Sequence, residues 1–183
     1  MARKSFVQLQ QDLLTAFPDN ITGLITPAIL RGFLDSFLQA IRPAYGLVAR
    51  SNATAQVVTS TDAPLVFDSG YVSDVPDFVA TPATGTLQRV DAGTTRMTLN
   101  ATMEGANGRL VSMTLYKNGV PTAWKASVTL AGAGKPVDVS MYSLTYDGAP
   151  AAYQMRVKCD TASESISFSN MDFFAESVPV NAY

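Results

Sequence analysis

The chain has 183 residues, of which 47% are hydrophobic and only 15% are charged, and its formal net charge is −2 at pH 7. This length suffices for one ordinary domain with an appendage. A net charge this close to zero lacks the excess of basic residues that is typical of a nucleic-acid-binding domain. Because there is no histidine, serine–histidine–aspartate and cysteine–histidine catalytic arrangements are impossible. The single cysteine, Cys159, excludes an intramolecular disulfide and an ordinary structural zinc site, and we expect it to be a small buried hydrophobe.

Residues 1–45 are expected to form an α-helical hairpin. Apolar residues recur at helical spacing in its first half, until Pro18-Asp19-Asn20 ends the run. The second helix is marked more clearly, because Thr26 can cap it and Pro27 suits a first helical position. It ends at Arg42-Pro43. Its apolar residues form two adjacent columns, which are Ile29, Phe33, Phe37 and Ile41, and Leu30, Leu34 and Leu38.

Such a hairpin buries little surface on its own, so its apolar stripe needs a partner. One interpretation is that it packs on the β domain of its own chain. The other, which we favour, is that it packs on copies of itself or on another protein, because residues 46–54 have the composition of a linker. We therefore predict a docking surface made by Phe6, Leu9, Leu13, Phe33 and Phe37. No signal-peptide core or transmembrane run is recognisable, so neither secretion by that route nor membrane insertion is expected.

From residue 55 to residue 183 the hydrophobic period changes to two, which indicates β-strands. Gly- and Asn-rich turns separate the candidates, and no helical stretch lies among them. Many short strands at this spacing predict a mainly β, antiparallel sandwich or barrel. The candidate strands are residues 55–60, 65–67, 86–90, 96–103, 109–117, 124–130, 137–144, 153–158, 165–168 and 173–178.

The strand at 109–117 is expected to pair on both sides, because Asn-Gly turns flank it. Of its two faces, the one with Val111, Met113 and Leu115 is apolar throughout, so we assign it to the core. Tyr116 would then point outward.

The stretch Lys117-Asn118-Gly119 is predicted to form an exposed two-residue hairpin turn with positive φ at Asn118 and Gly119. Pro121 follows, and proline cannot donate a ladder hydrogen bond. Either strand pairing begins only at Ala123 or Trp124, which we favour, or Pro121 marks a sheet edge. Trp124 is expected to pack in the core.

The remaining candidates for chemistry are Asp68, Asp74 and Asp77, which lie within one loop-rich segment. They could ligate calcium, and two of them could serve a glycosidase. The third interpretation, which we favour, is that they are solvated turn residues. No phosphate-binding glycine loop occurs, so no catalytic, cofactor or metal site is predicted and the protein is not expected to be an enzyme.

Residues 55–180 resemble the trimeric TNF/C1q-like jelly-roll modules of bacteriophage fibre and virion proteins. The resemblance depends on the alternation at 97–105, on "VSMTLYKNGV" at 111–120 and on "FSNMDFFAESVPV" at 168–180. The helix start at Ile25-Thr26-Pro27, with Arg31 following, is similar to a segment found near the start of phage fibre proteins.

The resemblance implies a TNF-like jelly-roll head, here preceded by the helical hairpin, and a homotrimer without cofactors. It implies a non-enzymatic virion structural protein, either a short tail or head fibre or a capsid decoration protein, assembled in the host cytoplasm. Its helices would dock on another virion protein, such as the capsid, the portal, the tail or a fibre adaptor. Its head would serve attachment to a glycan or protein of the host surface. The alternative is a carbohydrate-active jelly roll using Asp74 and Asp77, or a carbohydrate-binding one.

Overall fold

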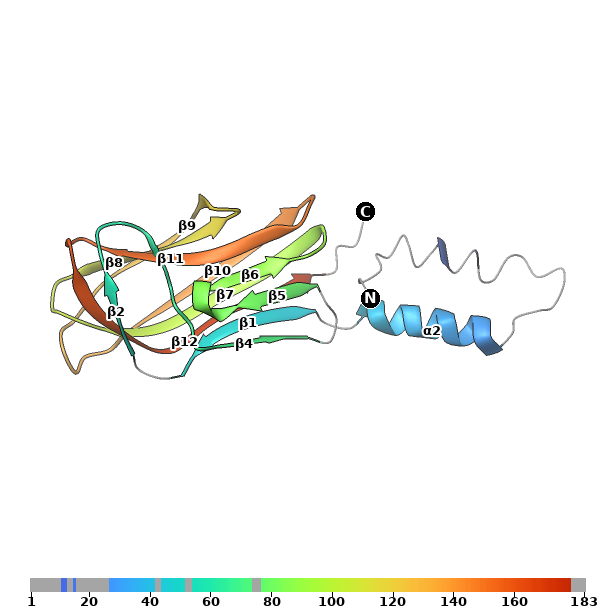
Figure 1. Cartoon of the computed structure of the whole chain (residues 1–183), viewed down its shortest axis with the longest axis horizontal. Coiled ribbons are helices and arrows are strands. Elements are labelled where there is room, and N and C mark those ends of the chain that lie inside the picture. The colour runs from blue at the N-terminus through green and yellow to red at the C-terminus, as the bar shows by residue number, and fades with distance from the viewer. Residues whose placement is uncertain are drawn as a thin grey trace.

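The structure, a computed structural model, describes residues 11, 12, 15, 27–41, 44–51, 54–73 and 77–178. In this part of the chain the α-helix α2 (Pro27–Ile41) precedes a β-sandwich and lies beyond one of its ends (Figure 1). None of the helices described is long and apolar enough to span a membrane. The strands are β1 (Tyr45–Arg50), β2 (Thr54–Val58), β3 (Ala63–Pro64), β4 (Ser69–Val72), β5 (Phe78–Thr81), β6 (Thr86–Arg89), β7 (Gly93–Glu104), β8 (Leu110–Lys117), β9 (Val120–Thr129), β10 (Val137–Asp147), β11 (Ala151–Cys159) and β12 (Glu164–Val178), with a 3-10 turn η1 (Pro82–Thr84) between β5 and β6.

The strands form two antiparallel sheets. Sheet A has the order β10-β7-β12-β1-β4, and β2 also pairs with β12. Sheet B has the order β5-β6-β11-β8-β9, and β3 also pairs with β11. The sheets stack face to face, with β9 and β10 in contact along one side of the sandwich and β4 and β5 in contact along the other (Figure 1). The predicted mainly β, antiparallel sandwich is therefore confirmed.

The core lies between the two sheets and is filled from alternate positions of their strands, as the period of two predicts. The predicted inward face of β8 is confirmed, because Val111, Met113 and Leu115 are all buried. Cys159 is also buried and carries a free thiol, as predicted. Phe173 of β12 is among the largest fully buried side chains.

Four strands, β1, β3, β4 and β5, lie where none was predicted. β1 occupies the first part of the expected 46–54 linker and pairs with both β12 and β4, so the sandwich begins at Tyr45. β4 and β5 are four-residue strands in the loop-rich region that contains the aspartates. The expected strand at 65–67 is irregular, and β3 precedes it. The two strands expected at 165–168 and 173–178 are parts of one long strand, β12, whose register shifts near Asn170, where φ is 47°.

The β8–β9 turn has the predicted conformation, with φ of 50° at Asn118 and 79° at Gly119. The expectation that pairing starts only at Ala123 or Trp124 is wrong, because Lys117 pairs with Val120 and Tyr116 with Pro121. Pro121 is tolerated because β9 is the edge strand of sheet B, where one side needs no ladder hydrogen bonds. A register shift between Thr114 and Tyr116 accompanies it.

The other Asn-Gly pair, Asn107-Gly108, does not turn a hairpin. β7 and β8 belong to different sheets, so this segment crosses from one sheet to the other. β8 does pair on both sides, as predicted, but its second neighbour is β11.

Two aromatic side chains differ from their expected environments. Tyr116 lies on the outer face of β8 yet is buried, because its hydroxyl donates to Asp62 Oδ2 at 2.8 Å and the Arg156 guanidinium lies 4.3 Å from the ring centroid. Trp124 was expected in the core but is 36% exposed, because β9 is an edge strand whose side chains are covered only from one side.

Candidate assembly face

The predicted docking residues are only partly within the described chain. Phe6, Leu9 and Leu13 lie outside the described residues. Phe33 and Phe37 lie on α2, where their rings stack with centroids 6.5 Å apart. Phe33 is half-buried and Phe37 is 44% exposed. Docking by these residues stays a prediction.

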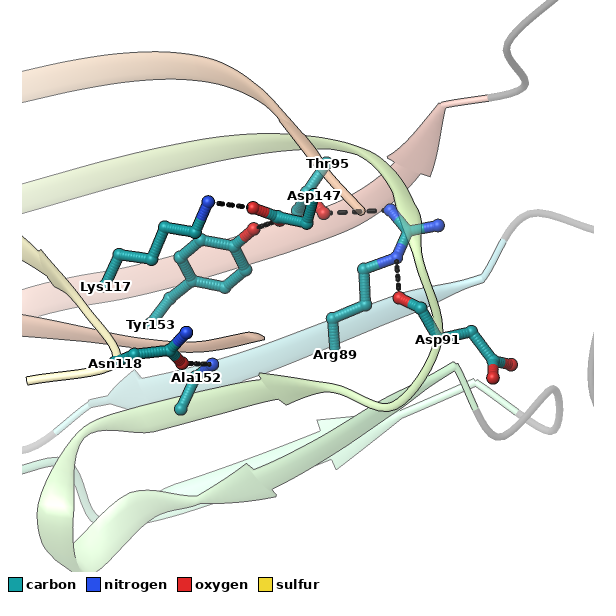
Figure 2. Close-up of polar contacts among 8 residues, drawn as sticks. All are labelled: Arg89, Asp91, Thr95, Lys117, Asn118, Asp147, Ala152 and Tyr153. Atoms are coloured by element: carbon teal, nitrogen blue, oxygen red, sulfur yellow. Dashed lines mark hydrogen bonds and ion pairs between the residues drawn. The ribbon is translucent and has the colours of Figure 1, made fainter. Parts of the chain in front are cut away.

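The predicted exposed turn is tied to the body of the sandwich. Asn118 accepts a hydrogen bond from the Ala152 N–H at 2.8 Å through Oδ1, and its own N–H donates to the Ala152 carbonyl at 2.8 Å (Figure 2). Lys117 pairs through Nζ with Asp147, a buried carboxylate that also accepts a hydrogen bond from the Tyr153 hydroxyl (Figure 2). Of the three turn residues, only Asn118 and Gly119 are exposed. Lys117 is half-buried and forms an ion pair.

The turn also lies toward the end of the sandwich from which α2 departs. Lys117 pairs with Tyr153, which is near the start of β11, and it contacts Asp147 at the end of β10. The β10–β11 connection lies at the α2 end in Figure 1. The loops at the opposite end are residues 105–109, 130–136 and 160–163.

A buried cation, Arg89, lies near this cluster (Figure 2). Its guanidinium donates to the Asp91 carbonyl at 3.0 Å, to Thr95 Oγ1 at 2.9 Å and to Ser177 Oγ at 3.0 Å. These bonds join β6 to β7 and β12, so the side chain links sheet B to sheet A. Like the Lys117–Asp147 pair, it is used in holding the sandwich together.

The three aspartates considered for calcium or glycoside chemistry do not come together as a described cluster. Asp68 is exposed and accepts a hydrogen bond from the Ser69 hydroxyl at 3.3 Å, whereas Asp77 is 2% exposed. Asp74 lies outside the described residues. Among the residues described, no group of three or more histidine, cysteine or carboxylate side chains could hold a metal ion.

The most distinctive surface is the outer face of sheet A, where register aligns apolar side chains across the strands. One row crosses five strands, with each residue directly opposite the next, and a second and third row lie toward the α2 end. Row one is Tyr142, Thr98, Phe174, Leu47 and Tyr71; row two is Leu144, Arg96, Glu176 and Tyr45; row three is Tyr146, Thr94 and Val178. We call these three rows the assembly face.

The aromatic and aliphatic members of the assembly face are exposed in the single chain. Tyr142 and Leu144 are each 52% exposed, Tyr146 is 67% exposed and Tyr71 is 61% exposed. Tyr45 and Phe174 stack with ring centroids 5.9 Å apart. Contiguous exposed apolar groups of this kind mark interaction surfaces in soluble proteins.

The two charged side chains of the assembly face pair with each other. Arg96 forms an ion pair with Glu176 in row two. One step farther from α2, Asn100 donates to both carboxylate oxygens of Asp172 at 3.0 Å. Covering the assembly face would therefore bury the Arg96–Glu176 ion pair and no unpaired charge, which costs less than burying a charge without a counter-ion.

The apolar surface continues around the β9–β10 side of the sandwich. Trp124 of β9 contacts Tyr142 edge-on, with ring centroids 6.5 Å apart and planes at 69°. Val120, also on β9, is 64% exposed. Trp124 and Tyr142 border a small apolar recess that leads to the core residues Met97 and Leu99. We call Val120 and Trp124 the edge strip.

The assembly face was not predicted from the sequence, although a signal was present. β10 is apolar on both of its faces: Val139 and Met141 point inward and are buried, while Tyr142, Leu144 and Tyr146 point outward. A strand with apolar residues at both odd and even positions is expected to be buried on both faces, and only one face of β10 is buried within the chain.

Comparison with solved structures agrees with this architecture. A TNF protein, Eiger from S. frugiperda, superposes with a TM-score of 0.59 at 12% identity, covering 78% of this chain and 96% of that one. The globular domain of zebrafish complement 1qA superposes with a TM-score of 0.54 at 14% identity, covering 76% of this chain and 98% of that one. The β head is a TNF/C1q-like jelly roll. No protein-family model and no curated protein sequence matches the chain.

These likenesses concern the fold alone, because both identities are low. The jelly roll accounts for the described residues between 45 and 178, and α2 precedes it. Neither neighbour is a phage protein by its description, so the virion role implied by the sequence resemblance is a proposal.

Proposed function

We propose that the chain is a non-enzymatic structural subunit of a bacteriophage particle, which assembles as a homotrimer through its jelly-roll head and docks through its helical N-terminal segment. The observation that carries the proposal is the assembly face. It presents exposed aromatic and aliphatic side chains in aligned rows, with its charges paired internally, on a chain of low overall charge. Such a surface is suited to permanent burial.

The arrangement favours a cyclic assembly. The assembly face and the edge strip are different surfaces of one chain and meet at β10, where Trp124 contacts Tyr142. A contact between the face of one copy and the edge of the next is heterologous, and repetition of such a contact closes into a ring when the rotation between copies allows it. We propose three copies, with sheet A turned toward the common axis.

The proposed non-enzymatic role is supported by how the polar groups of the head are used. The buried Lys117–Asp147–Tyr153 and Arg89 clusters join strands of the two sheets. Function in such a protein resides in its surfaces, and three identical heads on one axis present their loops together, so that three weak contacts act as one strong one.

The proposed orientation follows from the position of α2. If the N-terminal segment docks on the particle, the α2 end of the head faces the particle and so does the Asn118-Gly119 turn. The loops at 105–109, 130–136 and 160–163 then face outward. We propose them as the surface available for a host glycan or protein.

The oligomeric state is the first test. Sedimentation velocity of the full chain at micromolar concentration should show a trimer. Leu144→Glu should shift it to monomer while leaving the circular dichroism of the head unchanged, because Leu144 is half-exposed in the single chain. Gln88→Glu is the matched control, since it adds the same charge at an exposed position on the outer face of sheet B. A monomeric wild type, or a Leu144→Glu protein that remains trimeric, would contradict the proposed assembly.

The particle role is tested separately. Mass spectrometry of phage particles purified from a lysate of the encoding source should detect the chain at a constant ratio to the major capsid protein through successive density gradients. Loss of the chain during purification, with the trimer intact in solution, would contradict the virion role and leave the assembly standing.

A further inference from the structure

Helix α2 carries an apolar stripe that the described chain does not cover. Leu30, Leu34 and Phe37 are 45%, 46% and 44% exposed. The helix lies beyond the end of the sandwich and makes no extended contact with any strand described (Figure 1). A helix of 15 residues is marginal in water without packing, so this stripe needs a partner.

The spacing of the stripe is that of a coiled coil. Leu30, Leu34 and Phe37 are separated by four and then three residues, and Ile41 continues the sequence pattern after four more. Apolar residues alternating at intervals of four and three define the a and d positions of a heptad, through which parallel helices pack side by side. Asp35 and Gly32 fall on other faces of the helix and are exposed.

The connection to the head places the C-terminal end of α2 close to the assembly face. Only three residues separate the end of α2 at Ile41 from the start of β1 at Tyr45. Tyr45 belongs to row two of the assembly face, opposite Glu176. If three heads meet through this face, their α2 helices leave the heads close to the common axis, and each helix experiences a high effective concentration of the other two.

We infer that α2 associates with the α2 helices of the other two copies, in parallel, through Leu30, Leu34 and Phe37. The inference rests on the proposed trimer. In it, the apolar stripe of α2 is buried against the α2 helices of two further copies of this chain. Phe37 then lies inside the three-helix contact. Contact with the particle is left to Phe33 and to the chain that precedes α2.

Disulfide trapping tests the inference directly. Leu34→Cys in the full chain should form a disulfide between two copies on mild oxidation, because facing core positions of neighbouring helices approach within the reach of a disulfide. Asp35→Cys is the matched control, since it is one residue away, exposed, and on another face of the helix. The native Cys159 is buried in both variants and contributes equally. The expected result is a covalent dimer on a non-reducing gel for Leu34→Cys only.

The failures of this inference and of the proposed trimer are distinguishable. A wild-type trimer in which Leu34→Cys cross-links no better than Asp35→Cys overturns the helix contact and leaves the head assembly standing. A monomeric wild type overturns both.

Substitution by glutamine provides the second measurement, because glutamine retains helix propensity. Leu34→Gln should raise the concentration at which the trimer dissociates by about tenfold or more, whereas Asp35→Gln should leave it unchanged. Equal dissociation concentrations for the two variants would overturn the inference, even if both proteins fold normally.

Discussion

Replacing Gly119 by alanine should destabilise the head, whereas the same replacement at Gly148 should not. A Cβ added at either glycine would meet nothing within 4 Å, so steric crowding is absent at both. The two sites differ in backbone conformation, because φ is +79° at Gly119 while Gly148 has no positive φ. A side chain in the left-handed region costs about 1–2 kcal/mol. At an unstrained position, replacing glycine by alanine stabilises the fold by about 0.4–1 kcal/mol, because alanine lowers the conformational entropy of the unfolded chain.

The assay is thermal and urea unfolding followed by circular dichroism, with all variants at one protein concentration because assembly contributes to apparent stability. For a chain of 183 residues, 1 kcal/mol corresponds to a shift in Tm of about 2–4 °C. Gly119→Ala should therefore lower Tm by about 2–8 °C. Gly134→Ala should behave like Gly119→Ala, because φ is +72° there and space is again open. Equal effects at Gly119 and Gly148 would refute the assignment of the turn.

Three further predictions concern the polar and aromatic contacts. The hydrogen bond to Asp62, with burial, raises the pKa of Tyr116 above 10.0, so the Tyr116 hydroxyl loses its proton at lower pH in the unfolded state than in the folded state. The free energy of unfolding should therefore fall as pH rises above about 10, and this fall should be smaller for Tyr116→Phe in urea titrations across that range. Lys117→Met removes the cation beside the buried Asp147 and should cost about 2–3 kcal/mol in urea unfolding at pH 7, so an unchanged midpoint would show that the pair contributes nothing. Trp124 is the single tryptophan, and its emission should move to longer wavelength when the proposed trimer is diluted until it dissociates; a constant spectrum would show that Trp124 is not at the interface.

The parts of the fold that could be predicted are those with local signals. Alternation over β8 identified the buried set Val111, Met113 and Leu115, and Asn-Gly identified the positive φ values at Asn118 and Gly119. Both patterns depend on neighbours within a few residues. The position of Pro121 could not be resolved in this way, because its tolerance depends on β9 being an edge strand, which is a property of the whole sheet.

β1 was missed for the same physical reason. Its partners are β4 and β12, and its pairing with β12 involves residues more than a hundred positions away, as between Tyr45 and Glu176. Gly46 made the segment resemble a spacer. In the fold Gly46 is a buried strand residue, where an added Cβ would lie 3.0 Å from Phe78 Cβ and 3.2 Å from Leu87 Cδ2. The glycine permits close approach of β1 to sheet B, a requirement that no local pattern reveals.

The sequence could predict that the chain has an interaction surface, but not which residues form it. The jelly-roll resemblance indicated an assembling protein, while the assembly face depends on register between strands far apart in the sequence. Tyr142 and Tyr71 belong to one row because Thr98, Phe174 and Leu47 lie between them, and this alignment exists only once β10, β7, β12, β1 and β4 have paired in the observed order.

The outer face of sheet A changes character along its strands, and this gradient connects the assembly face to α2. Toward α2 the exposed side chains of β10 are Tyr142, Leu144 and Tyr146, whereas farther away the same face carries Ser140 and Asp138. Apolar contact between copies would therefore be strongest at the end of the head that adjoins α2, and weakest beside the loops at 130–136. A proposed trimer held mainly at one end could vary in sequence at its other end without dissociating. Such separation is expected of a head that docks at one end and binds through variable loops at the other.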